Sequence, residues 1–342
     1  MAKLVLERYR PIVDLGSGGQ ADVLVAFDEQ MKRRVAIKRV ALRDRHASAA
    51  AIEEARTAAM LNHPHIVTMY DFALSDEGAY AYLIMEHIDG VALCDIASED
   101  LTDEIVASIV RDVGDALTFA HKNGVLHLDI KPANIVINHE GLAKIIDFGV
   151  SALSQATGKT TATAGTVGYM PIEQLAGEPV SAATDQWAFA AVIYELLSDE
   201  FPYEEELCAA RRVRRAPGDL SLMQRLMTTD EPNLIQTDNK RLDEVLGRAL
   251  SRAALSRFPS VKELRDRLLE TLPQPRVGRK QLARIVAALT ADEVSEDGSG
   301  SHEHGKRPSP LGGCFTAMVS ALALLGTFLG TLALLLYSAI LT

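Results

Sequence analysis

The sequence predicts an α+β fold with two lobes, a β-rich lobe followed by a larger helical lobe, plus one C-terminal transmembrane helix. From about residue 8 to residue 98, short strand-like segments surround one helix, and from Leu101 onward apolar residues recur at helical spacing. Near the C-terminus, the stretch from Phe315 to Leu341 contains no charged residue. The chain has 342 residues, 48% of them hydrophobic, which is enough for a sizeable core.

The β-rich lobe is predicted from two segments, Arg34–Lys38 and Tyr80–Met85, in which β-branched and aromatic residues are frequent. Between them, the alanine-rich stretch from Ala47 to Leu61 favours a helix.

The helical lobe is predicted from apolar residues four positions apart, which place one face of a helix in a core. The first such face consists of Ile105, Ile109, Val113 and Leu117. The last strong apolar face consists of Leu264, Leu268 and Leu269.

Residues 273–311 are predicted to form a linker, and residues 312–342 a membrane anchor. Within the linker, a short amphipathic helix is expected, which either packs on the preceding domain or lies on a membrane. Its apolar residues are Leu282, Ile285, Val286 and Leu289. Residues 295–310 are rich in Gly, Ser, Glu and His, a composition typical of a flexible segment.

The uncharged stretch Phe315–Leu341 would be roughly 40 Å long as a helix, against about 30 Å of hydrocarbon, so we expect a tilted single-pass span. Lys306 and Arg307 precede it, which favours a cytoplasmic location for residues 1–310. If the chain is complete, it is a tail-anchored protein with nothing outside the cell to bind a ligand. Gly326 and Gly330 form a GxxxG pair that favours a homodimer, although such glycines also occur in spans that do not associate.

The net charge of −11 argues against a nucleic-acid-binding protein, because that function needs a basic surface. The chemistry of the chain is indicated by one short segment that carries a carboxylate, an ammonium and a carboxamide, at Asp129, Lys131 and Asn134. A second carboxylate, Asp147, follows within Asp-Phe-Gly. Phosphoryl transfer requires such groups: one receives the proton of the attacking hydroxyl, one neutralises phosphate, and two hold Mg²⁺.

A glycine-rich turn follows an apolar segment near the N-terminus, at Gly16, Ser17, Gly18 and Gly19. Glycines let the backbone approach phosphates closely, although glycine turns are also common in loops without ligands. Lys38 lies on the next predicted strand, where it either reaches the phosphates or is an ordinary solvated lysine.

Taken together and in this order, the motifs resemble those of the eukaryotic-like (Hanks-type) bacterial Ser/Thr protein kinases, over residues 9–272. The resemblance implies a two-lobed protein kinase fold, ATP and Mg²⁺ as cofactors, and transfer of the γ-phosphoryl group to Ser/Thr hydroxyls of protein substrates, including the kinase itself. It assigns Asp129 as catalytic base, Lys131 as the neutralising cation, and Asn134 and Asp147 as metal ligands.

The resemblance also implies a nucleotide pocket. Glu54 is the expected partner of Lys38, with Glu53 as its rival. The backbone of the hinge at Glu86 and Ile88 would bind adenine. The ring itself would lie between apolar side chains, namely Val23, Ala36 and Val136.

The resemblance also implies roles for residues of the helical lobe. Glu173 is expected to pair with Arg257, and Asp185 to support the backbone of the catalytic loop. Thr166 matches the threonine of Ser/Thr-specific members.

Three departures from the family pattern stand out. Ala21 replaces the third glycine, and Pro171-Ile172-Glu173 replaces the usual Ala-Pro-Glu. Leu128 replaces an arginine that pairs with a phosphorylated activation segment, so we expect activity that depends little on phosphorylation of residues 150–166. These departures leave open a membrane-anchored ATP-binding pseudokinase scaffold as the alternative function, while a small-molecule phosphotransferase is disfavoured by the segment from Thr166 to Glu173.

Overall fold

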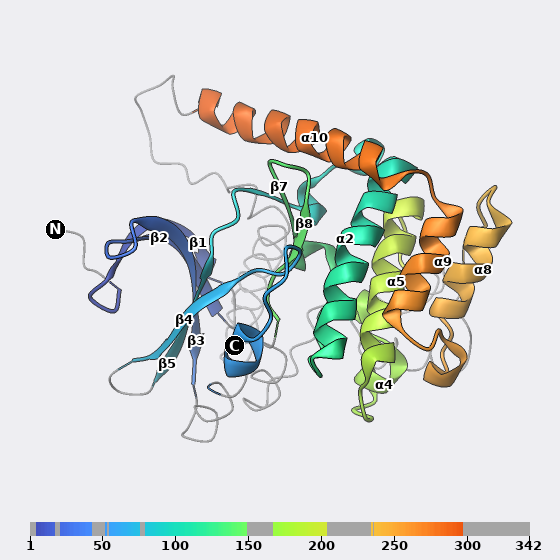
Figure 1. Ribbon diagram of the computed structural model, residues 1–342, viewed down its shortest axis with the longest axis horizontal. Coiled ribbons are helices and arrows are strands. Elements are labelled where there is room, and N and C mark those ends of the chain that lie inside the picture. Colours follow the sequence, from blue (N-terminus) through green and yellow to red (C-terminus); the bar gives the residue numbers. More distant parts are fainter. Residues whose placement is uncertain are drawn as a thin grey trace, which may run out of the picture.

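The computed structural model describes residues 5–17, 21–42, 52, 55–75, 79–148, 167–203, 234 and 236–296. These residues form two lobes, a twisted sheet and a group of helices, as Figure 1 shows. The two-lobed α+β prediction is therefore confirmed for the described part of the chain.

The N-terminal lobe is built on one antiparallel sheet of five strands, in the order β1-β2-β3-β5-β4. Its strands are β1 (Tyr9–Ser17), β2 (Ala21–Asp28), β3 (Arg33–Ala41), β4 (Met69–Leu74) and β5 (Tyr80–Glu86). The strands β3 and β5 contain the two segments that the sequence predicted as β.

The register of β3 determines where Lys38 points. Val35 and Ile37 are fully buried in the core of the lobe. Successive side chains of a strand face opposite sides, so Ala36 and Lys38 lie on the other face of β3. Val23 of β2 pairs directly with Lys38. These three residues thus belong to the neighbouring central strands of one sheet.

The C-terminal lobe consists of helices that lie side by side with a small three-stranded sheet on one flank (Figure 1). The helices are α2 (Asp103–Lys122), α4 (Ile172–Leu175), α5 (Ala182–Ser198), α8 (Lys240–Ala249) and α9 (Val261–Thr271). The strands are β6 (Gly90–Ala92), β7 (Ile135–Asn138) and β8 (Ala143–Ile145). Short 3₁₀ turns lie at Leu93–Asp95, Ser98–Asp100, Pro132–Asn134, Val167–Tyr169 and Ala254–Ser256.

The core of this lobe forms between α2, α5 and α9. The four predicted apolar residues of α2 are each at most 1% exposed, and Leu264 and Leu268 of α9 are fully buried. Helix α5 is buried from Thr184 to Tyr194, and its Trp187 donates an indole hydrogen bond of 3.0 Å to the carbonyl of Leu250. A helix buried on every side is expected at the centre of a helical lobe.

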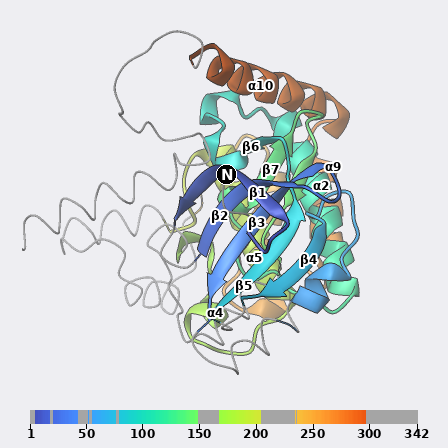
Figure 2. The same ribbon diagram turned by 90° about the vertical axis from the view of Figure 1, so that its left-hand side faces the viewer.

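Helix α10 (Pro275–Glu296) crosses α2 and the small sheet, and Figure 2 shows it running above β6 and β7. Leu282 and Val286 are fully buried against the lobe. At Gly278, a Cβ atom would lie 1.8 Å from the carbonyl oxygen of Glu104, so only glycine permits this close approach. Of the two positions expected for the amphipathic helix, packing on the domain is therefore the one observed.

No helix within the described ranges is long and apolar enough to cross a membrane. The predicted anchor at residues 312–342, with Gly326 and Gly330, lies outside those ranges.

Candidate active site

An ion pair between Lys38 and Asp147 joins the two lobes. The ammonium Nζ of Lys38 on β3 donates to Oδ2 of Asp147, which follows β8, over 2.7 Å. The Lys38 side chain is 10% exposed and that of Asp147 is 24% exposed. Burial alone would raise the pKa of the Asp147 carboxyl, but the charge and hydrogen bond of Lys38 outweigh it and hold the pKa below its ordinary value. Asp147 is therefore a carboxylate at neutral pH.

Asp129, Lys131 and Asn134 form a compact group on the loop before β7. Lys131 Nζ lies 2.9 Å from Oδ2 and 3.2 Å from Oδ1 of Asp129. Asn134 donates its side-chain amide to both the backbone oxygen of Asp129, at 2.7 Å, and Oδ2, at 3.0 Å. The 3₁₀ turn Pro132–Asn134 brings Asn134 back toward Asp129, because it turns the chain once before β7 begins.

His127 connects this loop to the segment that carries Asp147. Its Nδ1 accepts the backbone N–H of Asp129 at 3.2 Å, and its Nε2 lies 2.9 Å from the carbonyl oxygen of Ile146. Because a backbone N–H can only donate, Nδ1 is the acceptor and Nε2 carries the proton given to Ile146. The ring is fully buried and meets Phe148 edge-on at 4.7 Å. His127 is thus a buried structural link between the two segments.

Asp185, in the first turn of α5, fixes the backbone of the same loop. Its carboxylate is fully buried and accepts the N–H of His127 at 2.8 Å and that of Leu128 at 2.7 Å. The predicted support of the catalytic loop by Asp185 is therefore confirmed. The ring of His121 on α2 also contacts this carboxylate, at 2.8 Å. No spacing in the sequence pointed to His121.

Leu128 has a left-handed backbone with φ of 62°, a conformation that costs about 1–2 kcal/mol for a residue other than glycine. It is held from both sides, since Asp185 accepts its N–H and Gln174 of α4 donates 2.7 Å to its carbonyl oxygen. Sequence reasoning missed Gln174, because its partner is a backbone atom distant in the chain.

The predicted pair of Glu173 and Arg257 is also confirmed. Arg257 makes two parallel bonds to the Glu173 carboxylate, of 2.7 and 3.1 Å, and its guanidinium is fully buried. Thr184 of α5 donates a further bond of 3.2 Å to the same carboxylate. These contacts tie α4, which carries Gln174, to the body of the lobe.

Comparison with known proteins agrees with this geometry. Residues 9–285 match the family described as protein kinase domain. The chain belongs to the protein kinase domain family. Among its relatives, the serine/threonine-protein kinase PknB of Mycolicibacterium smegmatis is 34% identical over 277 residues, which cover 77% of this chain and 43% of that protein. PknB of Mycobacterium tuberculosis is also 34% identical over 277 residues, covering 77% of this chain and 42% of that protein.

Among solved structures, the PknI kinase domain of Mycobacterium tuberculosis superposes with a TM-score of 0.57 at 26% identity. The match covers 77% of this chain and 95% of that one. The chain thus spans well under half the length of the curated PknB relatives, but nearly all of a solved kinase domain.

Protein kinase domains use ATP with Mg²⁺, and the described side chains fit both. The amide nitrogen of Asn134 is bonded to Asp129, which leaves the side-chain carbonyl oxygen as the atom available to a metal. The N–H of Ile146 donates 2.9 Å to the backbone oxygen of Asn134, so Asn134 and Asp147 belong to adjacent, hydrogen-bonded chain segments. Two oxygen donors are what Mg²⁺ takes from a protein when phosphates and water supply the rest.

The apolar residues assigned to adenine lie in both lobes of the kinase domain. Val23 and Ala36 belong to β2 and β3, and Val136 lies on β7, where it is 6% exposed. Their contact with a nucleotide stays a prediction.

The hinge residues follow β5. Glu86 ends the strand, and its carboxylate is already occupied by Lys144 at 2.6 Å and by the N–H of Thr68 at 3.2 Å. Ile88 packs against the apolar cluster of the N-terminal lobe. Since the Glu86 side chain has partners, any contact to adenine here comes from the hinge backbone, as the sequence analysis expected.

The remaining predicted site residues lie either at the end of a described segment or outside the described residues. Gly16 and Ser17 end β1, opposite the start of β2. Gly18, Gly19 and Glu54 lie outside the described residues, as do Gly149 and Thr166. The pairing of Lys38 with Glu54 therefore stays a prediction, whereas its contact with Asp147 is observed.

Proposed function

We propose that this chain is a serine/threonine protein kinase, which transfers the γ-phosphoryl group of ATP to Ser or Thr hydroxyls of proteins, itself included. The observation that carries the proposal is the Lys38–Asp147 contact of 2.7 Å. It supports the proposal because Lys38 is the lysine expected to bind phosphate and Asp147 the carboxylate expected to bind the metal. The names of the PknB relatives support the choice of serine and threonine as acceptors.

Each group of the site has one task in this reaction. MgATP supplies the electrophilic phosphorus and ADP as leaving group. Asp129 orients the acceptor hydroxyl and receives its proton, and Lys131, 2.9 Å from Asp129, neutralises charge on the transferred group. Lys38 positions the α- and β-phosphates, while Asn134 and Asp147 hold the metal.

The direct test is incorporation of labelled phosphate from γ-labelled ATP, by the chain itself and by a general protein substrate. Asp129→Asn is the matched control, because it keeps the size of the side chain and removes its charge. We expect label on serine and threonine from the wild type, none with magnesium chelated, and at least a hundredfold less from Asp129→Asn, roughly the contribution of a positioned base. Label no higher than that of the variant would instead favour the pseudokinase scaffold.

We further propose that residues 315–341 anchor the kinase domain to a membrane as a single span, with the domain in the cytoplasm. The support is the uncharged stretch itself and the Lys306-Arg307 pair before it. Resistance of the chain to alkaline carbonate extraction tests this, and release of the chain by carbonate would contradict it.

Association through Gly326 and Gly330 is part of the same proposal. Replacing both glycines by isoleucine should abolish self-association of the isolated span in a membrane, because larger side chains block close approach. A span that is monomeric with its own glycines would remove the homodimer.

A further inference from the structure

A basic hollow lies between α10, α2 and the turn that joins β7 to β8. Its volume is about 410 Å³, within the range of small-ligand sites. Its lining residues are Arg111, Glu140, Arg276, Arg279, Lys280 and Ala283, none of which belongs to the candidate active site. We call it the α10 hollow.

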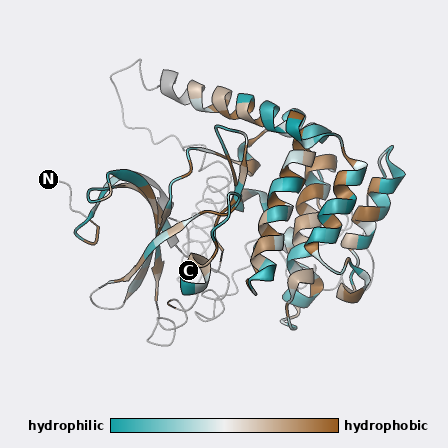
Figure 3. Ribbon diagram, in the orientation of Figure 1, coloured by the Kyte–Doolittle hydropathy of each residue, from teal (hydrophilic) through white to brown (hydrophobic). Residues whose placement is uncertain are grey.

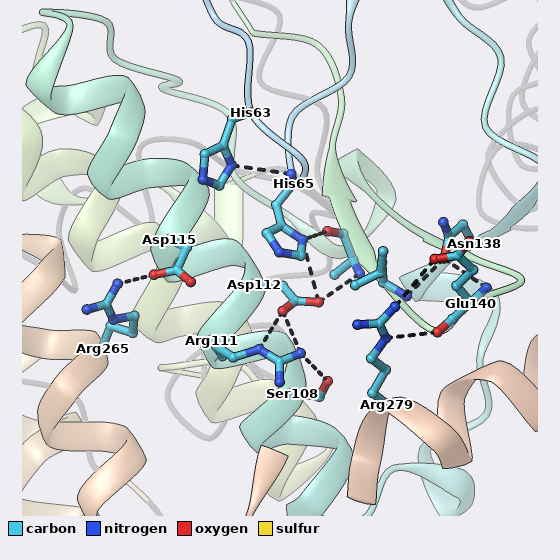
Figure 4. A network of polar contacts seen from close by, with 12 residues as sticks. His63, His65, Ser108, Arg111, Asp112, Asp115, Asn138, Glu140, Arg265 and Arg279 are labelled. Atoms are coloured by element: carbon cyan, nitrogen blue, oxygen red, sulfur yellow. Dashed lines mark hydrogen bonds and ion pairs between the residues drawn. The ribbon is translucent and has the colours of Figure 1, made fainter. Parts of the chain in front are cut away.

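Two of its arginines are held in place by partners, as Figure 4 shows. Arg111 of α2 donates 2.8 Å from Nε to Asp112, and its Nη2 lies 3.4 Å from the hydroxyl of Ser108. Asp112 is 1% exposed and also accepts the N–H of Ala143 at 3.2 Å. Arg111 is thus positioned from behind by a carboxylate that solvent does not reach.

Arg279 is positioned from the other side of the hollow. Its Nε donates 3.1 Å to the carbonyl oxygen of Glu140, and Nη2 lies 3.4 Å from the Glu140 carboxylate (Figure 4). The turn approaches α10 closely, since a Cβ atom at Gly141 would lie 2.0 Å from the carbonyl oxygen of Arg279.

The hollow carries uncompensated positive charge. Asp112 and Glu140 balance Arg111 and Arg279, whereas Arg276 and Lys280 are exposed and make no ion pair with any described residue. These two lie four positions apart on α10, so their like charges repel. An anion bound between them would relieve this repulsion. In a chain of net charge −11, the pair leaves a local surplus of two positive charges. A phosphate monoester carries about −1.5 to −2 at neutral pH, which matches this surplus.

We propose that the α10 hollow binds the phosphate-bearing headgroup of an anionic lipid. The outward face of α10 continues the pattern, because Arg284 and Val277 are exposed there beside Lys280. Figure 3 shows the half of α10 nearest α2 as mostly hydrophilic. Exposed basic residues with apolar neighbours are typical of helices that lie on anionic membranes.

The choice of a lipid also rests on the proposed span. The chain between Glu296 and Phe315 can extend at most roughly 65 Å, so the end of α10 stays within that distance of the membrane surface. A phosphopeptide or free phosphate offers the same chemistry, and the experiment separates these sources.

The experiment is a titration calorimetry of the full chain in neutral detergent, with dihexanoyl phosphatidic acid as probe. The wild type should bind it, and Arg276→Gln/Lys280→Gln should weaken binding at least about tenfold, the effect of losing charge-assisted bonds. Lys122→Gln/Lys240→Gln is the matched control, since it removes the same charge from exposed residues of α2 and α8 that do not line the hollow; it should change affinity by less than about threefold.

Three further probes identify the source of the phosphate. Dihexanoyl phosphatidylcholine should bind at least about tenfold more weakly than phosphatidic acid, because its headgroup has no net charge. Inorganic phosphate should also bind more weakly, and equal affinity would replace the lipid by free phosphate. A phosphoserine peptide that binds more tightly than the lipid would overturn the lipid assignment in favour of a protein partner.

Absence of binding, or equal weakening by both double variants, would overturn the site itself. Unchanged thermal unfolding of the variants confirms that they fold, as expected for exposed side chains that make no ion pair with a described residue. The measurement in detergent does not depend on membrane insertion, so failure of the proposed anchor is recognised separately, by carbonate extraction.

Discussion

Lys38 Nζ lies 2.7 Å from Oδ2 of Asp147, so the central strand of one lobe is bonded directly to the segment after β8 in the other. This contact lies where the two lobes meet, and we propose that phosphates and a metal bind beside it. Around it, His127 and Asp185 hold the catalytic loop through its backbone.

Asp185→Asn should lower kcat more than it changes KM for ATP. The Asp185 carboxylate accepts two backbone N–H groups and contacts His121. The amide of asparagine would direct its own N–H toward one of these donors. The lost hydrogen bond would destabilise the loop by about 1–3 kcal/mol. The loop that carries Asp129 is thereby loosened, while the nucleotide cleft is not touched. Steady-state kinetics with thermal unfolding measure both effects.

The matched control for this prediction is Asp28→Asn. Asp28 is equally buried and accepts bonds from Arg8, Gln30 and Met31, but it lies in the N-terminal sheet. Its replacement should reduce stability without lowering kcat. Equal loss of kcat in both variants would mean that stability alone is being measured.

Arg8→Gln should remove stability in a pH-dependent way. The hydrogen bond from Arg8, helped by the N–H groups of Met31 and Gln30 and opposed by burial, lowers the pKa of Asp28 from 3.8 to about 2. A carboxyl whose pKa is lower in the folded state than in the unfolded state stabilises the fold at any pH above the unfolded-state pKa. This stabilisation is lost as the pH falls toward the folded-state pKa of about 2. The shift corresponds to about 2 kcal/mol.

Urea unfolding of wild type and variant at several pH values checks this. We expect the difference in unfolding free energy to be full above about pH 5 and to shrink as pH falls below 4. A difference that is constant between pH 6 and pH 3, or that grows on acidification, would contradict the role given to Arg8.

The sequence predicted the central elements because their signals are local. β3 follows from its β-branched residues and α2 from apolar residues four positions apart, and the predicted catalytic group around Asp129 lies within one short segment. The direct contact of Lys38 with Asp147 was not predicted, since it depends on how the lobes close. The position of α10 could not be decided either, because Leu282 and Val286 fit a core and a membrane surface equally well; the choice depends on the space between Gly278 and Glu104.

Gly278→Ala should therefore destabilise the domain and loosen α10. The added methyl would lie 1.8 Å from the carbonyl oxygen of Glu104. The clash is with backbone atoms of α2, which a change of side-chain rotamer cannot remove, so α10 has to move. Gly247→Ala on α8 is the control, because nothing lies within 4 Å of its Cβ position. It should be neutral or stabilise the domain by up to about 1 kcal/mol.

Hydrogen exchange along α10 and α2, together with thermal unfolding, distinguishes these cases. Faster exchange in α10 of Gly278→Ala alone is the expected result. Identical exchange in both variants would show that α10 does not depend on this contact.

Replacing Thr160, Thr161 and Thr163 together by alanine should reduce turnover by less than about tenfold. Leu128 offers no cation to a phosphorylated segment, and its backbone is held instead by Asp185 and Gln174, neither of which needs phosphate. Kinase assays before and after phosphatase treatment measure this. A larger loss in the triple variant would show that phosphorylation controls the loop by another route.

The most direct measurement is calorimetry of ATP binding with and without Mg²⁺, on wild type, Asp147→Asn and Asp129→Asn. If Lys38, Asn134 and Asp147 surround one metal-bound triphosphate, Mg²⁺ strengthens binding to the wild type and to Asp129→Asn, and this gain disappears in Asp147→Asn. Nucleotide affinity that is independent of Mg²⁺ in all three proteins, or no nucleotide binding by the wild type, would contradict that arrangement.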